Sequence, residues 1–226
     1  MTISTNDLLN SIMQSFDRIS HVDAKDIPNI DLYMDQVTTF MDSHMRATTR
    51  NPEEDKILTK TMINNYAKND LLPPPVKKKY SKEHVLVLIF IYYFKGVLSI
   101  GDIQELLNPL TERFFGKDSD VKLEDIYNEV FSMEASRVET LKKDVAQMYA
   151  AAETTFDGVE GENQEFLRRF AFICMLSYDV YVKKLLIEKI IDGMKVENIK
   201  TEKTKPEKTK AEKVKPEKIK KDTTKK

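Results

Sequence analysis

The chain has 226 residues, 41% of them hydrophobic and none of them tryptophan, which is enough apolar material for the core of one or two domains. Residues 1–7 show neither the basic stretch nor the apolar run of a secretory signal, so we expect a cytoplasmic protein. The single cysteine, Cys174, excludes an intrachain disulfide and a multi-cysteine metal site, and its apolar neighbours predict a small buried side chain.

The formal net charge of −1 conceals a strong asymmetry along the chain. From residue 197 onward there are 12 lysines and 6 acidic residues, so this tail carries +6 and residues 1–196 carry −7. Between residues 56 and 84 there are seven lysines against two acidic residues, a local charge of +5. A basic island within an acidic body predicts that contact with a polyanion is local and oriented.

Sequence motifs for catalysis and for phosphate binding are missing. There is no Gly-x-x-x-x-Gly-Lys-Ser/Thr loop and no Gly-x-Gly-x-x-Gly, and the chain has only six glycines. The three histidines, His21, His44 and His84, are too scattered for metal-ligand spacing. We therefore expect a protein that is not an enzyme and holds no cofactor or metal, and whose function is binding.

Helical periodicity dominates the first part of the chain. Apolar side chains recur at helical spacing over residues 7–19 and 32–45, and the second set includes Tyr33 and His44. A loop over residues 47–55 precedes a predicted helix from 59 to about 69, and the three consecutive prolines after it must be extended.

Ser81 is the predicted N-cap of a helix over residues 82–95, which contains ten consecutive apolar residues. This run is too short to cross a membrane, and Lys95, Ser99 and Asp102 would lie in the hydrocarbon. We expect a central core helix and no membrane insertion.

A capping box formed by Ser99 and Asp102 predicts a further short helix. It is expected to end at Leu107, because Pro109 follows closely.

The second half of the chain is also predicted to be helical, with a helix over residues 123–131 and a narrow apolar seam over 138–152. Residues 162–192 form a long helix that is apolar on more than one face, which requires two partners: the preceding helix and a second subunit. The repeating Lys/Glu-rich tail, residues 197–226, has almost nothing apolar to bury and is expected to be disordered.

The most informative stretch lies in the basic island. On the predicted helix, five polar residues fall together at spacings of three and four, opposite an apolar side: Lys60, Thr61, Asn64, Asn65 and Lys68. Asparagine offers a paired donor and acceptor to adenine, lysine reaches guanine or phosphate, and phosphate contacts add affinity without reading sequence. Three further lysines follow the rigid triproline: Lys77, Lys78 and Lys79. The alternative is a solvated amphipathic helix beside a basic loop.

Short motifs follow one another in this region in a fixed order, namely residues 62–66, 71–73, 80–81, the apolar helix, 98–103 and 106–107. Their order resembles that in the DNA-binding head of MerR-type regulators. This resemblance implies a winged helix-turn-helix in which Lys60, Thr61, Asn64 and Asn65 contact bases and Lys68, Lys77, Lys78 and Lys79 contact phosphates. The chain departs from the family pattern at Asn64, where an arginine is usual, at Asp70, where glycine is usual, and in a short wing without glycine.

The stretch from the run Asn29–Val37 through Lys79 and Tyr80 is similar to a bacterial family catalogued only as a domain of unknown function, number 1836, and the similarity covers residues 25–190. The fold expected is mainly all-α, with an N-terminal MerR-like winged helix-turn-helix, then a helical bundle or hairpin, then the tail. The expected division is an N-terminal helix and linker (1–28), the winged helix-turn-helix (29–110), a helical dimerisation or effector region (111–196) and the disordered tail (197–226).

The function expected is a sequence-specific transcriptional regulator that binds double-stranded DNA as a homodimer through its C-terminal helices, at a pseudo-palindromic site. The alternative is a helical protein–protein adaptor that does not bind DNA. A third interpretation is a small apolar effector held in the helical C-terminal half by Met133, Met148, Tyr149, Phe156, Phe170 and Tyr178.

Overall fold

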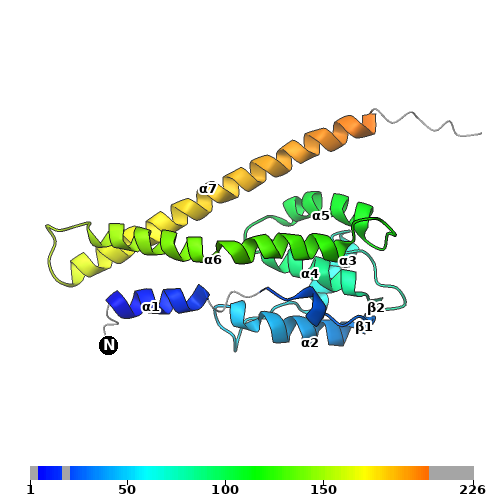
Figure 1. Ribbon diagram of the computed structural model, residues 1–226, viewed down its shortest axis with the longest axis horizontal. Helices are drawn as coiled ribbons and strands as arrows, with labels where there is room; N and C mark the ends of the chain where they lie inside the picture. The colour runs from blue at the N-terminus through cyan, green and yellow to red at the C-terminus, as the bar shows by residue number, and fades with distance from the viewer. Residues whose placement is uncertain (1–4, 17–20, 204–226) are drawn as a thin grey trace, which may run out of the picture.

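The computed structural model describes residues 5–16 and 21–203, which are mainly helical as the sequence predicts (Figure 1). The elements in chain order are α1 (Thr5–Phe16), a 3₁₀ turn η1 (Ala24–Asp26), β1 (Leu32–Tyr33), α2 (Met34–Met45), a second 3₁₀ turn η2 (Arg46–Thr48), α3 (Lys60–Lys68), β2 (Lys79–Tyr80), α4 (Lys82–Phe94), α5 (Ile100–Phe114), α6 (Leu123–Glu153) and α7 (Glu162–Lys203). They form two regions. The head comprises residues 21–131, and the arm comprises α1, the rest of α6 and α7, although Ile191 of α7 is buried in the core of the head.

The head is built around α4. Its N-cap is Ser81, as predicted, and eight consecutive residues from His84 to Ile91 are buried. A helix buried on all sides must be covered by several elements, and here residues of α2, α3, α5 and the first turns of α6 share one apolar core with it. The predicted core helix is therefore confirmed. None of the described helices is both long and apolar enough to span a membrane.

The first two turns of α6 belong to the head, not to the arm. Leu123, Tyr127 and Phe131 are buried in the core, and the Tyr127 hydroxyl donates a hydrogen bond of 2.5 Å to the carbonyl of Val22. The ring of Phe90 contacts those of Tyr127 and Phe131, at centroid distances of 5.5 and 5.7 Å. The two predicted segments of residues 123–131 and 138–152 are thus parts of one continuous helix.

The prediction that Pro109 ends a short helix is wrong. α5 opens at Ser99, whose hydroxyl accepts a hydrogen bond from the Asp102 amide, and it continues through Pro109 to Phe114. Proline removes one backbone hydrogen bond, but Leu110 and Phe115 beyond it pack against the core and favour continuation of the helix. The expected domain boundary at residue 110 therefore falls inside α5.

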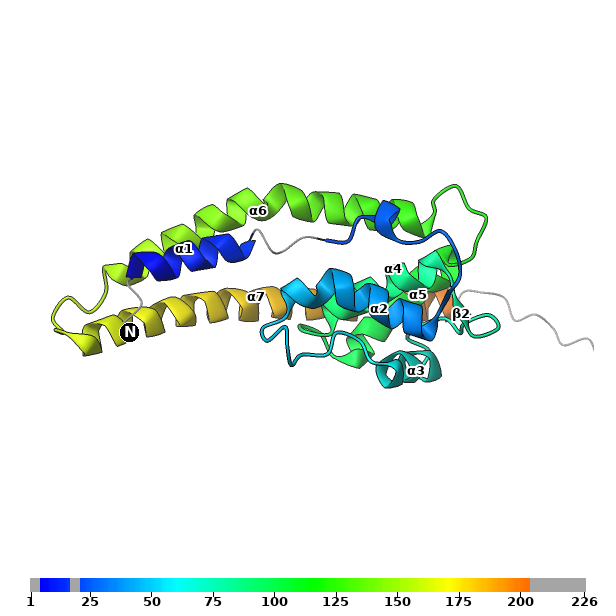
Figure 2. The same ribbon diagram turned by 90° about the horizontal axis from the view of Figure 1, so that it is seen from below.

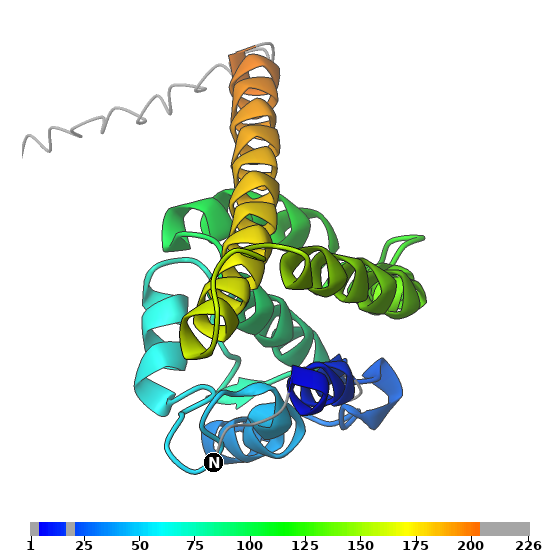
Figure 3. The ribbon, with the colours of Figure 1, turned by 90° about the vertical axis from the view of Figure 1, so that its left-hand side faces the viewer.

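The arm has a small core of its own. Tyr149 and Ala152 of α6 and Phe172 of α7 are buried together, and Leu9 and Ile12 of α1 pack against them. Figure 2 shows α1 lying along α6, and Figure 3 shows α7 running away from α6 towards α5. α7 extends to Lys203, so the first residues of the predicted tail are helical, whereas residues 17–19 and 204–226 lie outside the described residues.

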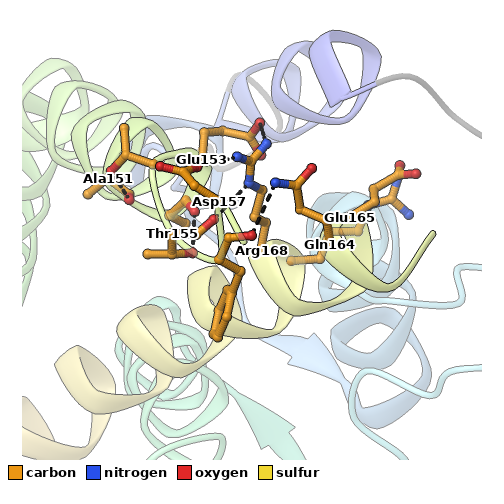
Figure 4. A network of polar contacts seen from close by, with 11 residues as sticks. Ala151, Glu153, Thr155, Asp157, Gln164, Glu165 and Arg168 are labelled. Atoms are coloured by element: carbon orange, nitrogen blue, oxygen red, sulfur yellow. Dashed lines mark hydrogen bonds and ion pairs between the residues drawn. The ribbon is translucent and has the colours of Figure 1, made fainter. Parts of the chain in front are cut away.

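The turn between α6 and α7 is held by Arg168 and by Gln164, whose side-chain amide donates to the carbonyl of Phe156 at 3.1 Å (Figure 4). The Arg168 guanidinium donates to the carbonyl of Thr155 at 3.0 Å and to the carboxylate of Asp157 at 2.9 Å, and it lies 3.9 Å from the carboxylate of Glu153. A planar fork with several donors suits this arrangement, because it joins the end of α6, the turn and the first turns of α7.

The expectation that Cys174 is buried is wrong, because its side chain is exposed on α7. Tyr33 on β1 and His44 on α2 are exposed as well, and His44 stacks on Phe40. Four of the six residues expected to hold an apolar effector are also exposed, namely Met133, Phe156, Phe170 and Tyr178, so the six do not line one enclosed pocket.

Candidate nucleic-acid interface

The helix α3 separates its two faces as the sequence predicts. The Thr59 hydroxyl caps it by accepting a hydrogen bond from the Met62 amide at 3.2 Å, and Ile63 and Tyr66 are buried in the head. The polar residues of the opposite side are all exposed: Lys60, Thr61, Asn64, Asn65 and Lys68. Burial raises the pKa of the Tyr66 hydroxyl, so this ring stays neutral and anchors the helix.

The C-terminal end of α3 is closed by a residue in the left-handed conformation. Asp70 has φ 55°, and the amides of Leu71 and Leu72 both donate to the carbonyl of Tyr66, at 2.9 and 3.2 Å. This is the position where helices favour glycine. This left-handed conformation explains why glycine is usual at this position in the family that the sequence resembles. Asp70 adopts the same conformation at a cost in conformational energy.

A tight hairpin presents the lysines after the triproline. The backbones of Val76 and Lys79 exchange two hydrogen bonds, of 3.1 and 3.0 Å, around a two-residue turn. The turn residues Lys77 and Lys78 have φ 51° and 64°, as required for a type I′ turn. Asparagine and glycine are usual there, so two lysines hold a conformation that costs each of them about 1–2 kcal/mol. Both side chains are exposed at the tip.

His84 fastens the proline segment to α4. Its Nδ1 accepts a hydrogen bond of 2.9 Å from the Ser81 amide, and its Nε2 lies 3.4 Å from the carbonyl of Pro74. Burial lowers the pKa of His84, against the smaller opposing effects of the Pro74 carbonyl and of Asp31. A neutral ring that accepts at Nδ1 and donates at Nε2 satisfies both contacts, so the hairpin leaves α4 in a defined direction.

The N-terminal end of α2 contacts both lysine-bearing elements. Asp35 forms an ion pair with Lys60 of α3. Two residues earlier, Tyr33 of β1 pairs with Lys79 in an antiparallel ladder, and the Lys79 ammonium lies 5.2 Å from the centre of the Tyr33 ring. The start of α3 and the hairpin are thus brought to one end of α2.

The eight residues predicted to contact DNA lie on α3 and on the hairpin, and they differ in their contacts. Lys60 is paired with Asp35, and Lys79 is partly buried against Tyr33, whereas the other six side chains are exposed. Tyr33 and Asp35 were missed, because their role depends on the pairing of β1 with a strand more than forty residues away. In the structure Leu32 is buried and Tyr33 is exposed, an alternation of two residues that is too short to be recognised in the sequence.

A hollow of about 480 Å³ lies between α4 and the loop before α3. Its one deep cation, Lys95, donates to the carbonyl of Ile57 at 2.8 Å and lies over the Tyr92 ring, and burial lowers its pKa. The Tyr92 hydroxyl lies 2.8 Å from that of Thr48. These groups hold the loop against α4, so the hollow is a structural junction.

No curated protein and no solved structure matches the chain. Residues 22–130 match the family model described as Domain of unknown function (DUF1836). The matched residues coincide with the head, from the carbonyl of Val22 that receives the Tyr127 hydroxyl to the turn of α6 beside Phe131. For these residues, the match supports the family that the sequence resembles, Domain of unknown function (DUF1836).

Proposed function

We propose that this chain binds double-stranded DNA as a transcriptional regulator, with α3 in the major groove and the 76–79 hairpin on the phosphates. The observation that carries the proposal is the joint attachment of α3 and the hairpin to the N-terminal end of α2, through Asp35 and Tyr33. One rigid element thereby positions an amide-bearing helix beside a lysine-bearing hairpin, which is how a helix-turn-helix protein with a wing addresses a duplex.

The two elements have different roles in the proposal. Thr61, Asn64 and Asn65 are exposed on one side of a short helix, with groups that hydrogen-bond to base edges. Lys77 and Lys78 stand at the hairpin tip, where each phosphate contact releases a counterion. Lys60 is assigned a weaker role than the sequence predicts, because Asp35 already neutralises it. Lys68 extends the phosphate contact along α3.

The backbone of the hairpin supports this division. A turn with Asn-Gly would be more stable, so lysine at both positions is not explained by folding. In this proposal, positive charge at the tip is kept for contact with phosphates, which explains why two lysines occupy strained backbone positions. The substitution Lys77→Asn with Lys78→Gly should therefore stabilise the protein and weaken its binding to DNA, two effects of opposite sign that a purely structural turn would not produce.

The proposal is tested by sequencing the genomic fragments that the full chain retains and by measuring its affinity for them over a salt series. Asn64→Ala with Asn65→Ala should reduce the preference for retained over random duplex at least about 10-fold, since each base contact contributes about 1–3 kcal/mol. Lys77→Gln with Lys78→Gln should weaken binding to both duplexes and lower the slope of log affinity against log salt by about 2.

Lys142→Gln with Lys143→Gln, on α6, removes the same charge at a distance from α3 and serves as the matched control. It should leave both the preference and the salt slope unchanged. Absence of salt-sensitive binding to any duplex would contradict the proposal, and so would an unchanged slope in the hairpin variant.

A further inference from the structure

The polar face of α3 has a fixed orientation and is open to solvent. Figure 2 shows α3 on the side of the head away from α6. Its apolar side is buried in the head, so the helix cannot rotate about its own axis. At 3.6 residues per turn, Thr61 and Lys68 lie at the centre of the exposed face, and Asn64 and Asn65 lie on either side of that centre.

The first turns of α3 are poorly suited to a G·C base pair. Guanine is read by arginine or lysine, whose donors meet its two acceptors, O6 and N7. Residues 56–84 contain no arginine, and Lys60 is ion-paired with Asp35. Lys68 lies in the last turn, whereas the N-terminal residues of a recognition helix are the ones that contact base edges.

The cytosine of such a pair also lacks a partner on α3. Cytosine is read by an acidic side chain, which accepts a hydrogen bond from the N4 amino group. Asp35 already holds Lys60, and Asp70 lies beyond the last turn, in the left-handed conformation that closes the helix. The groups that remain for reading bases are one threonine and two side-chain amides.

These groups are complementary to an A·T base pair. An asparagine side chain presents one donor and one acceptor, which match the N7 acceptor and the N6 amino group of adenine. Guanine presents two acceptors instead, so the amide oxygen would stay unpaired, at a cost in binding free energy. The methyl group of Thr61 suits the methyl group of thymine, the base that pairs with adenine.

The spacing of the three residues sets how many base pairs they reach. Asn64 and Asn65 point about 100° apart around the helix, so they cannot bind the same base. From Thr61 to Asn65 the helix rises roughly 6 Å, which is less than two base-pair steps of about 3.4 Å. The two amides therefore address two neighbouring base pairs.

We infer that α3 reads two neighbouring A·T base pairs, with Asn64 and Asn65 each bound to one adenine and Thr61 packed on a thymine methyl group. The inference rests on the proposed binding to DNA and adds which bases are read. Lys77 and Lys78 of the hairpin contact phosphates in that proposal, and phosphate contacts do not depend on the bases. The preference for A·T pairs is thus a property of α3 alone.

The bases are identified by selecting bound duplexes from a pool with a randomised central segment, using the full chain. Two neighbouring A·T pairs should be enriched. Replacing either adenine by 7-deazaadenine removes the N7 acceptor, keeps the base pair and should weaken binding about 10-fold. Replacing the contacted thymine by uracil removes one methyl group and should weaken binding about 3-fold. The protein is unchanged in these measurements, so loss of folding cannot explain the result.

The assignment to α3 is tested by exchanging an amide. Asn65→Arg should change the preferred base at one of the two positions from adenine to guanine, because arginine supplies two donors to the two guanine acceptors. Asn65→Ala should abolish the response to 7-deazaadenine at that position and keep it at the other. Asn128→Arg, at an exposed position of α6, adds the same charge and should leave the preferred bases unchanged.

The outcomes separate this inference from the proposed function. Enrichment of G·C pairs at the position that responds to Asn65→Ala would overturn the inference and leave the binding to DNA intact. Salt-sensitive binding without any enriched base, or an affinity that 7-deazaadenine leaves unchanged, would do the same. Absence of binding to every duplex in the pool would overturn both.

Discussion

The helices α4 and α7 are both apolar around much of their circumference, yet their surroundings differ completely. Eight consecutive residues of α4 are buried by other elements of the head, whereas α7 is exposed over most of its length. An apolar helix sequence predicts that the helix is buried, but it does not say which other elements bury it. The other elements of the chain cover α4 almost completely, whereas they leave eleven large hydrophobic side chains of α7 exposed.

The largest effect that tests this comparison comes from matched substitutions in the two helices. Ile89 of α4 is fully buried, and Ile173 of α7 is 58% exposed. Ile89→Ala should lower the free energy of unfolding by about 2–5 kcal/mol, since it removes buried methyl groups and leaves a cavity. Ile173→Ala should change it by less than about 1 kcal/mol in dilute protein. Urea denaturation measures both, and equal losses would contradict the contrast between a buried α4 and an exposed α7.

The next effect concerns Arg168, which fastens the start of α7 to the end of α6. Arg168→Ala should destabilise the arm by about 1–3 kcal/mol, because it leaves the Thr155 carbonyl and two carboxylates without their donor. Hydrogen exchange should accelerate in the first turns of α7 while α4 keeps its protection. Arg113→Ala, at an exposed position of α5, is the control. Accelerated exchange in α4 as well would show that head and arm unfold together.

A smaller, pH-dependent effect is expected in the head. Burial lowers the pKa of His84 below its ordinary value of 6.5, so the neutral ring contributes stability above that pH, and the contribution is lost as the pH falls through the folded pKa. The free energy of unfolding should therefore fall on acidification below pH 6.5. His84→Asn keeps an acceptor for the Ser81 amide but does not titrate, so its profile should be flatter. Parallel profiles would exclude this role for His84.

The smallest effect is expected at the end of α3. Asp70→Gly should stabilise the head by at most about 1 kcal/mol, because glycine adopts the left-handed conformation without strain but loses more backbone entropy on folding. Asp70→Ala removes the same charge and should not stabilise. Comparing the midpoints of thermal unfolding of the two variants separates the effect of backbone strain from the effect of charge. A higher midpoint for the alanine variant than for the glycine variant would contradict the explanation by backbone conformation.

The sequence predicted the helices of the head well, because their ends carry local signals. Thr59 and Ser81 begin α3 and α4, and the polar and apolar sides of α3 follow from spacing alone. The prediction failed at Pro109, where packing of Leu110 and Phe115 outweighs a local signal, and at Tyr33, where a strand pairing replaces helical spacing. The sequence predicted which residues of α3 and the hairpin form the candidate site, but it did not predict how these two elements are brought together.

The sequence by itself determined where α3 and the basic stretch lie, and which side of α3 faces away from the core, because spacing and capping act within a few residues. Only the tertiary structure showed that Asp35 and Tyr33 bring α3 and the hairpin to one end of α2, and that Lys77 and Lys78 occupy a strained turn. It also decided which of two apolar helices is covered. Burial depends on the direction in which each helix leaves its neighbours, and no local pattern specifies that direction.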